Sequence, residues 1–299
     1  MNLHHLWIFY HVAHTQHITR AAEELYMSQP AVSQHMRTLE KELKQALLVR
    51  MGNKIYLTEA GKQLAEYAGR IFALVEDAEQ AMQEFHGLQR GTLRIGASTT
   101  PGTYLLPRFL AAFQLRYPQI ALNVTMKNTE LIAELVSQYQ LDLGFVAGEV
   151  VRAEIEQKKW QDDQLVFVGP LTKPLPSPCS IEQLQQLPLP LLLREKGSGT
   201  RAIIEQYFQH CGTTLPDVYI ELNSAEMLKQ AVIAGLGYAF IPQAALGSEL
   251  QARQLELIPL AEGMPRRTLY SIFPREKQLS RAAQAFLDLL EEQPGKGNA

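Results

Sequence analysis

The sequence predicts an α/β protein in three parts: a winged helix-turn-helix at residues 1–58, a long linker helix at residues 59–90 and an α/β domain at residues 91–294. Three observations predict this fold class. Short helical and strand patterns fill the first part, an unbroken helical pattern follows, and strands then alternate with helices. With 299 residues the chain can form two folded units and a connector, each unit burying its own core.

The composition predicts a folded protein in the cytoplasm. Hydrophobic residues make up 46% and charged residues 20%, as in ordinary globular proteins. No apolar run reaches the roughly eighteen residues needed to cross a bilayer, and residues 1–10 lack the pattern of a signal peptide, so we expect no membrane partner. Cys179 and Cys211 lack CxxC spacing, which favours two ordinary thiols over a zinc ribbon, a disulfide framework or a redox pair. We expect no metal and no cofactor.

Three helices are predicted in the first part. The first is indicated by the three- and four-residue spacings of Leu3, Leu6, Tyr10 and Ala13. A second begins at Thr19 as N-cap and runs to Leu25, and after a tight connection Ser28 caps a third, which reaches about Leu43 with Pro30 in its first turn.

The third predicted helix has an apolar face and a polar face. Val32, Met36, Leu39 and Leu43 form a stripe that must pack inward. The opposite face presents Pro30, Gln34, Arg37 and Lys41, with Ser33 and Thr38 beside them. Amides, hydroxyls and guanidinium groups read base edges and phosphates in a major groove, so this face is typical of DNA recognition.

Charge and a predicted wing support the same reading. The whole chain has a net charge of -3, but residues 1–58 carry six Lys and Arg against four Glu, an excess of two positive charges. Residues 47–50 and 55–57 predict two short strands around a turn at 51–54, whose tip offers Arg50, Asn53 and Lys54 to a phosphate backbone or minor groove.

A long helix is predicted from Thr58 to about His86. Its apolar residues alternate spacings of four and three, which is the pattern of a coiled-coil seam: Leu64, Ala68, Ile71, Val75, Ala78, Met82 and Phe85. The alternative is a helix packed on its own domain, and Phe72 and Leu74 widen the apolar face in that sense. We expect dimerisation through this helix.

From residue 91 onward, strand and helix patterns alternate, which predicts parallel sheets with helices on both faces. Helices are expected at 105–117, 129–138, 199–210, 224–234 and 280–292, and strands at 92–97, 120–126, 141–147, 165–168, 189–193, 218–222 and 238–241. The proline-rich segment 170–178 is interpreted as the crossing between two lobes, one at about 91–168 and 269–294, the other at about 169–268. The last helix is expected to return to the first lobe.

The run Ile18–Ser33 (ITRAAEELYMSQPAVS), with Leu39-Glu40 and Leu57–Gly61 (LTEAG), closely resembles the LysR-type transcriptional regulators. This resemblance covers nearly the whole chain. It implies a winged helix-turn-helix, a dimerising linker helix and a two-lobed effector-binding domain similar to periplasmic binding proteins, assembled as a homotetramer of two dimers. The implied partners are a double-stranded DNA operator, a small effector, other copies of the chain and, as a candidate, RNA polymerase.

The resemblance places the family's DNA-contacting positions at Gln29, Pro30, Ser33 and Gln34. Many relatives have arginine where this chain has Gln34, and Arg favours guanine whereas Gln pairs well with adenine. Together with the polar face and the wing, the residues expected to contact DNA are Thr19, Ser28, Gln29, Pro30, Ser33, Gln34, Arg37, Arg50, Asn53 and Lys54.

Two helix starts in the α/β domain are predicted to bind a small anion. The segments 98–102 and 196–201 both follow strands, and backbone N–H groups and the helix dipole favour an anion there, with Arg201 adding a forked contact. The alternative is a pair of ordinary turns with Arg201 in a surface ion pair. In the resemblance both segments line the interlobe cleft, and the expected effector-binding residues are Ser98, Thr99, Thr100, Asn128, Thr129, Gly148, Gly199, Thr200, Arg201, Asn223 and Ser224. The 197–201 turn resembles that of relatives controlling inorganic carbon or sulfur assimilation.

Other classes of protein fit less well. The sequence holds no G-x-S-x-G elbow, HExxH motif or Walker loop, so an enzyme is not expected. A solute-binding protein of a transport system would have similar lobes. It would also carry a signal peptide, and it would lack the DNA-binding segment. Six histidines crowd into the first part: His4, His5, His11, His14, His17 and His35. They are read as helix surface residues rather than metal ligands, and their protonation below about pH 6.5 is a hypothesis for stronger DNA binding.

Overall fold

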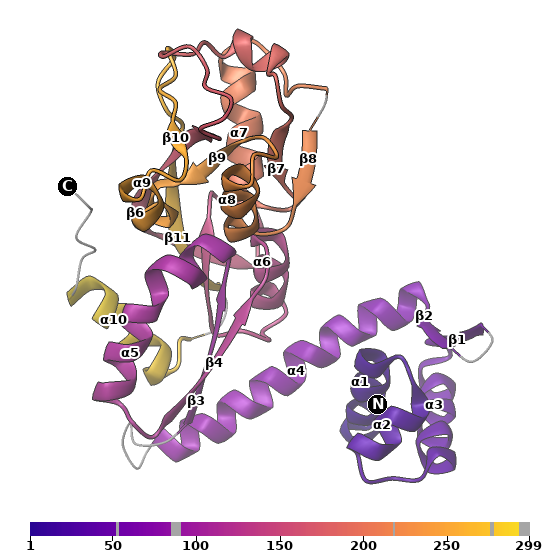
Figure 1. Cartoon of the computed structure of the whole chain (residues 1–299). Coiled ribbons are helices and arrows are strands. Elements are labelled where there is room, and N and C mark those ends of the chain that lie inside the picture. The colour runs from indigo at the N-terminus through magenta and orange to yellow at the C-terminus, as the bar shows by residue number, and fades with distance from the viewer. Residues whose placement is uncertain (52–53, 85–90, 218, 276–277, 293–299) are drawn as a thin grey trace. The chain divides into compact units, whose positions relative to one another are not determined.

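The computed structural model describes residues 1–51, 54–84, 91–217, 219–275 and 278–292 (Figure 1). The chain divides into an N-terminal unit of Met1–Met82 with Gln138–Gln140 and a C-terminal unit of Gln83–Ser137 and Leu141–Ala299. In the described residues, no helix is long and apolar enough to cross a membrane.

Three helices build the core of the N-terminal unit: α1 (Leu3–Thr15), α2 (Ile18–Glu24) and α3 (Gln29–Leu43). In α1 the buried side chains include Leu6, Phe9 and Val12, whereas Leu3 is exposed and lies outside the inward face that the spacing predicted. The prediction of Thr19 as N-cap is wrong, because His17 occupies the cap and Thr19 is exposed within α2. Ile18 is buried in the core as the first residue of α2, so the helix starts before Thr19, although threonine is a better N-cap residue than histidine.

Helix α3 has the predicted two faces. Ser28 is its N-cap, and the Ser28 hydroxyl accepts a hydrogen bond from the Ala31 N–H at 3.3 Å. Val32, Met36 and Leu39 are buried in the core of the unit. The opposite face is therefore turned outward.

A two-stranded wing follows α3. Strands β1 (Leu48–Met51) and β2 (Lys54–Leu57) pair antiparallel, with Leu48 opposite Leu57. The Glu40 carboxylate of α3 accepts hydrogen bonds from the Leu47 and Leu48 N–H groups at 2.8 and 3.2 Å, which fixes the base of the wing to α3.

Helix α4 (Glu59–Glu84) confirms the long helix, but the predicted seam divides into two surfaces. Leu64, Ala68 and Ile71 pack against the core of the helix-turn-helix, as expected for a helix packed on its own domain. Val75 and Met82 are exposed, at 43% and 61%. Phe85, His86 and the boundary at 89–90 lie outside the described residues.

The first lobe of the C-terminal unit is a sheet with helices on both faces. Strand β3 (Gly91–Ala97) pairs parallel with β4 (Ile120–Met126) and β5 (Leu143–Ala147). Helices α5 (Leu106–Arg116) and α10 (Arg281–Glu292) share one core, where Phe113 meets Phe286, and α6 (Thr129–Ser137) covers the other face. The return of the last helix to this lobe is confirmed.

The second lobe repeats this design (Figure 1). Strand β7 (Leu191–Arg194) pairs parallel with β8 (Tyr219–Leu222) and β9 (Tyr238–Pro242). Helix α7 (Gly199–His210) packs on one face through Ile204 and Phe208, and α8 (Ala225–Ile233) packs on the other. The smaller elements are η2 (Glu182–Gln186), η3 (Gln243–Ala245), α9 (Ser248–Gln251) and β10 (Glu256–Leu257).

Two antiparallel strands join the lobes, so the sheet is mixed: the expected parallel pairing holds for β3 with β4 and β5 and for β7 with β8 and β9, but not for the crossing strands. Strand β6 (Ile155–Gly169) pairs with β11 (Arg266–Pro274) as far as Gln164 and with β9 from Leu165 onward. The chain thus crosses between lobes inside β6, before the proline-rich segment 170–178. Within residues 155–164 Ile155 is buried and the other positions are exposed or half-buried and mostly polar, so this segment lacks both the apolar run and the alternation that predict a strand.

Candidate functional site

The outward face of α3 presents most of the side chains expected to contact DNA. Gln29, Pro30, Gln34 and Arg37 are exposed, and Ser33 is half-buried beside them. Ser28 is also exposed, with its oxygen already accepting the Ala31 N–H, and Thr19 lies exposed on α2. Asn53 and the side chains of Arg50 and Lys54 lie outside the described residues.

A cavity of about 930 Å³ lies between the two lobes of the C-terminal unit. Four residues expected at the effector site line it: Thr129, Gly148, Gly199 and Arg201. The other expected residues lie outside its lining: Ser98, Thr99, Thr100, Asn128, Thr200, Asn223 and Ser224. Cationic side chains at its wall include Arg152, Lys196 and Arg266, and acidic ones include Glu130 and Glu149. The wall is therefore charged and of mixed sign.

The lobes touch where α7 begins. A Cβ on Gly199 would lie 1.7 Å from the Ala147 carbonyl oxygen at the end of β5, so only glycine fits there. Nearby, the Glu130 N–H donates to the Gly197 carbonyl at 3.2 Å, and the Asn128 amide donates to the Lys196 carbonyl at 3.5 Å. This contact joins the carboxyl ends of the strands in the first lobe to the start of α7 in the second lobe.

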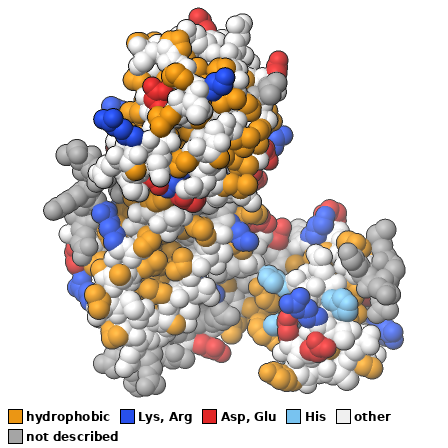
Figure 2. Space-filling model, viewed as in Figure 1, with side chains coloured by type: hydrophobic (Ala, Val, Ile, Leu, Met, Phe, Trp, Pro, Cys, Tyr) orange, Lys and Arg blue, Asp and Glu red, His pale blue; other side chains and the backbone are white. Residues whose placement is uncertain are grey.

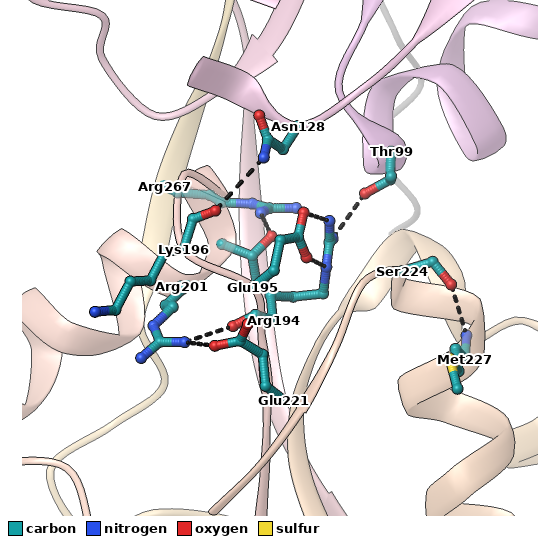
Figure 3. A network of polar contacts seen from close by, with 11 residues as sticks. Thr99, Asn128, Arg194, Glu195, Lys196, Arg201, Glu221, Ser224, Met227 and Arg267 are labelled. Carbon is teal, nitrogen blue, oxygen red and sulfur yellow. Dashed lines mark hydrogen bonds and ion pairs between the residues drawn. The ribbon is translucent and has the colours of Figure 1, made fainter. Parts of the chain in front are cut away.

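A buried polar network continues from this contact (Figure 3). The Arg194 Nη1 group donates to the Thr99 hydroxyl at 2.7 Å, which bridges β7 of the second lobe and the turn after β3 of the first. Arg194 is 2% exposed and is held by the Glu195 carboxylate at 2.8 and 2.9 Å. Thr100 is buried in the same turn, and Ser98 is 5% exposed with no hydrogen-bond partner for its hydroxyl among the described residues.

A second buried guanidinium reaches α7 from the crossing strand β11. Arg267 Nη1 donates to the Thr200 hydroxyl at 2.6 Å, while Nε and Nη2 pair with Asp163 at 2.8 and 2.6 Å. Burial lowers the pKa of Arg267, an effect that Asp163 opposes and the nearby Arg194 reinforces. Each of the two buried guanidinium groups is thus paired with a carboxylate, Arg194 with Glu195 and Arg267 with Asp163.

Comparison with known proteins identifies the family. The lysR-type bacterial regulatory helix-turn-helix matches residues 3–62, and the LysR substrate binding domain matches residues 86–295. The chain belongs to the LysR family. It is a DNA-binding transcription regulator, which confirms the resemblance, the fold class and the non-enzymatic function expected from the sequence.

Individual relatives of this LysR-type regulator cover between 70% and 100% of its length. The RuBisCO operon transcriptional regulator of Allochromatium vinosum is 34% identical over 97% of this chain and 95% of that protein. The CcmR regulatory domain of Synechocystis PCC6803, solved in complex with 2-PG, is 30% identical, with a TM-score of 0.64 over 70% of this chain and 100% of that one. A full-length OxyR of Pseudomonas aeruginosa shares the fold, with a TM-score of 0.73 at 24% identity over 100% and 99% of the two chains.

Arg201 of the regulator does not offer its guanidinium freely to the cavity. It is buried and donates to Glu205 at 2.8 Å, to Glu221 at 2.5 Å and to the Arg194 carbonyl at 3.0 Å. Although burial works to lower it, the pKa of Arg201 is raised because these carboxylates and Tyr219 hydrogen-bond to the charged group. Arg201 holds the end of β7 in place and is buried rather than in a surface ion pair; its forked contact to a ligand stays a prediction.

Asn223 and Ser224 lie at the start of α8 and do not line the interlobe cavity of the regulator. The Ser224 hydroxyl accepts from the Met227 N–H at 3.0 Å as a helix cap (Figure 3), and Asn223 is exposed. In contrast, Arg194 and Arg267 were missed by the sequence analysis. Arg194 could have been found, because a charged residue that ends the buried run Leu191–Leu193 lies at the carboxyl end of a parallel strand.

Histidines are visible on the surface of the N-terminal unit (Figure 2). The His35 ring on α3 lies 5.3 Å from that of His4 and 5.1 Å from that of His5. Burial lowers the pKa of His35, and the neighbouring His5 and His4 lower it further. Among the described residues, no group of three or more His, Cys, Asp or Glu side chains is placed to hold a metal ion.

Both cysteines of the regulator are free thiols. Cys179 is buried and Cys211 is half-buried. Burial raises the pKa of each thiol, and Glu262 raises it further. Since the thiolate is the reactive form, the structure favours the reading of two ordinary thiols.

Proposed function

We propose that the regulator reads a palindromic operator with paired copies of α3 and the wing. The exposed amides of Gln29 and Gln34 contact base edges, Arg37 contacts phosphates beside them, and Ser28, Pro30, Ser33 and Thr19 lie at the approach to the groove. In this proposal Arg50, Asn53 and Lys54 of the wing contact the phosphate backbone of the DNA. In a dimer the two recognition helices enter successive major grooves about 34 Å apart.

The assembly is proposed to be a dimer through α4 and a tetramer of two dimers, acting in the cytoplasm and contacting RNA polymerase at the promoter. The exposed apolar side chains in the second half of α4 support the dimer. The relative from Allochromatium vinosum is named for the RuBisCO operon, so promoters of carbon-assimilation genes are the first DNA to test.

A small anionic metabolite bound between the lobes is proposed to control the regulator. The observation that carries this proposal is the Ser98 hydroxyl, buried without a hydrogen-bond partner in the described structure, in the turn that presents Thr99 to Arg194. An unsatisfied buried hydroxyl costs free energy unless a ligand uses it. The Arg194 guanidinium donates to Thr99 in the same turn and can also donate to an anion, and the related CcmR domain was solved with 2-PG.

The remaining expected residues have separate places in this proposal. Asn128, Thr129 and Thr200 surround the contact between the lobes, and Gly148 and Gly199 let the backbones approach there. Thr100 is buried in the turn that carries Ser98 and Thr99. Bound anion would favour one arrangement of the lobes, and the equilibrium would shift only by its difference in affinity for the two arrangements.

The effector proposal is tested with Ser98→Ala in the full chain, using 2-phosphoglycolate and inorganic phosphate in a thermal-shift titration. The parent should gain melting temperature by mass action. Without ligand, Ser98→Ala should be as stable as the parent or more stable, because it removes an unsatisfied polar group, yet its affinity for the anion should fall.

The matched control is Ser137→Ala in the same lobe. The Ser137 hydroxyl is buried and donates to the Glu134 carbonyl at 2.8 Å, so its loss should cost about 1 kcal/mol of stability and leave anion affinity unchanged. If Ser98→Ala lost stability to the same extent and kept the parent's affinity, Ser98 would be a structural residue and the proposed site would be wrong.

A further inference from the structure

A second connection between the lobes lies away from the interlobe cavity. The Tyr104 hydroxyl in the π-helix η1 (Pro101–Leu105) of the first lobe donates to Glu226 Oε2 in α8 of the second at 2.9 Å. Neither residue lines the cavity. This hydrogen bond joins segments 122 residues apart in the sequence and belongs to no ladder or cap.

The acceptor of this bond is fixed by its own lobe. Lys229 is buried, and its ammonium pairs with Glu226 at 2.9 Å and with Glu249 at 2.6 Å, and donates to the Ala245 carbonyl at 3.3 Å. The same ammonium lies 5.9 Å from the centre of the Tyr104 ring. Glu226 is therefore held in place before Tyr104 reaches it.

The donor is held in its protonated form. Burial raises the pKa of Tyr104, and the hydrogen bond to Glu226 raises it further. The hydroxyl consequently remains a donor throughout the physiological pH range.

The donor is also connected directly to the proposed effector turn. The Gly102 N–H donates to the Ser98 carbonyl at 2.9 Å, and the Leu106 N–H closes the π-turn on the Pro101 carbonyl. Single π-turns are rare and are frequently found at functional sites. One short, hydrogen-bonded segment thus carries Ser98 and Thr99 at one end and Tyr104 at the other.

We propose that Tyr104 and Glu226 form a latch that holds the two lobes in the arrangement in which the effector binds. Tyr104 and Glu226 are positioning residues, since they act through the turn that carries Ser98 and Thr99. The latch raises apparent affinity by keeping the binding-competent arrangement populated before the ligand arrives. It rests on the proposed function, because it assigns the regulation of the same interlobe site.

Tyr104→Phe tests the latch, because it removes one hydroxyl and keeps the ring. The matched control is Tyr207→Phe, whose hydroxyl donates to the Gly263 carbonyl at 2.6 Å entirely within the second lobe. We expect the apparent affinity of the full chain for 2-phosphoglycolate to fall about five- to tenfold in Tyr104→Phe, the effect of losing one good hydrogen bond, and to stay unchanged in Tyr207→Phe.

A second measurement needs no ligand. Spin labels at the exposed positions Ala111 in α5 and Glu182 in η2, in a Cys211→Ser background, report the distance between lobes within one chain when labelled protein is diluted with unlabelled protein. Tyr104→Phe and Glu226→Ala should each broaden this distance distribution, and the double variant should broaden it no further than either alone.

Two results would overturn the latch. One is an unchanged distance distribution in Tyr104→Phe, and the other is additive broadening in the double variant. If the parent binds no anion at all, the proposed function fails, while the distance measurement still decides whether Tyr104 and Glu226 hold the lobes together.

Discussion

Gly199 shows how a single residue controls the contact between the lobes. Its Cα faces the Ala147 carbonyl at the end of β5, and a Cβ would also meet the Thr129 hydroxyl at 2.9 Å. The contacted atom of Ala147 is its backbone carbonyl oxygen, which cannot rotate away as a side chain could. Any residue larger than glycine at position 199 must therefore push α7 away from β5. The glycine is required by close approach and not by an unusual φ.

Gly199→Ala should therefore destabilise the C-terminal unit by about 1–3 kcal/mol and weaken anion binding, because the lobes cannot approach as closely. The control is Gly247→Ala, where no atom lies within 4 Å of the new Cβ and φ is -83°. Chemical denaturation and anion titration of both variants measure the two effects. Equal stability of the two variants would show that the contact yields without cost.

Gln29 and Lys54 are predicted to act on DNA in different ways. Gln29→Ala should cost about 1–3 kcal/mol on the operator and little on random DNA, since an amide that reads a base edge supplies discrimination. Lys54→Ala should weaken both alike and reduce the salt dependence by about one phosphate contact. Fluorescence anisotropy with both DNAs at several salt concentrations measures this. An equal loss on both DNAs for Gln29→Ala would remove it from the base readers.

Residue roles in the cleft were only partly predictable. The helix-start signal at 197–201 correctly marks a place where the lobes meet, but the cation that crosses to the first lobe is Arg194 rather than Arg201. In the sequence Arg194 ends a strand and Arg201 lies in the first turn of the following helix. Arg194 pairs with its sequence neighbour Glu195, whereas Arg201 pairs with Glu221. The packing of β8 beside β7 brings Glu221 to Arg201, and the sequence does not show this.

At the scale of elements, α3 was the most predictable helix and α4 only partly so. In α3 the cap, the proline and the apolar stripe all indicate the same boundaries, and the structure has them. In α4 the heptad spacing describes one continuous stripe, yet its first half is covered by the core of the unit. A local pattern reports which residues need burial, but it does not report what buries them.

The packing of α1 on α3 predicts a pH dependence of stability. His35 has a pKa lowered from its ordinary value of 6.5 by burial and then by His5 and His4, so the unfolded chain binds the proton more tightly than the folded chain. The free energy of unfolding should thus be highest above pH 6.5 and fall as the pH drops below it towards the folded-state pKa.

His35→Gln should flatten this fall in thermal melts of the full chain between pH 7.5 and about pH 5.5. His17→Gln, at an exposed cap position without a side-chain hydrogen bond, should leave the profile as in the parent. Identical profiles for His35→Gln and the parent would assign the pH dependence to other groups. The separate hypothesis that histidine protonation strengthens DNA binding stays a prediction, checked by affinity at constant salt between pH 6 and 8.

For the whole molecule, the exposed half of the α4 seam predicts where two chains meet. Val75 and Met82 are apolar side chains left exposed within the chain, and helix pairing would bury them. Val75→Glu should raise the dimer dissociation constant about tenfold or more, equivalent to ~1.4 kcal/mol. The control is Gln63→Glu, an exposed polar position of the same helix. Sedimentation velocity measures both, and an unchanged dimer in Val75→Glu would place the interface elsewhere.

The sequence by itself determined the recognition helix, the long helix, the alternation of strands with helices and, through the motif at 18–33, the family. These follow from local spacing and capping, which act over a few residues. Only the tertiary structure decided the antiparallel crossing of β6 with β11, the covering of half the seam, and the pairing of Thr99 with Arg194 and of Tyr104 with Glu226. Each of these joins residues far apart in the chain, and their meeting depends on how completed elements pack rather than on the pattern within any one of them.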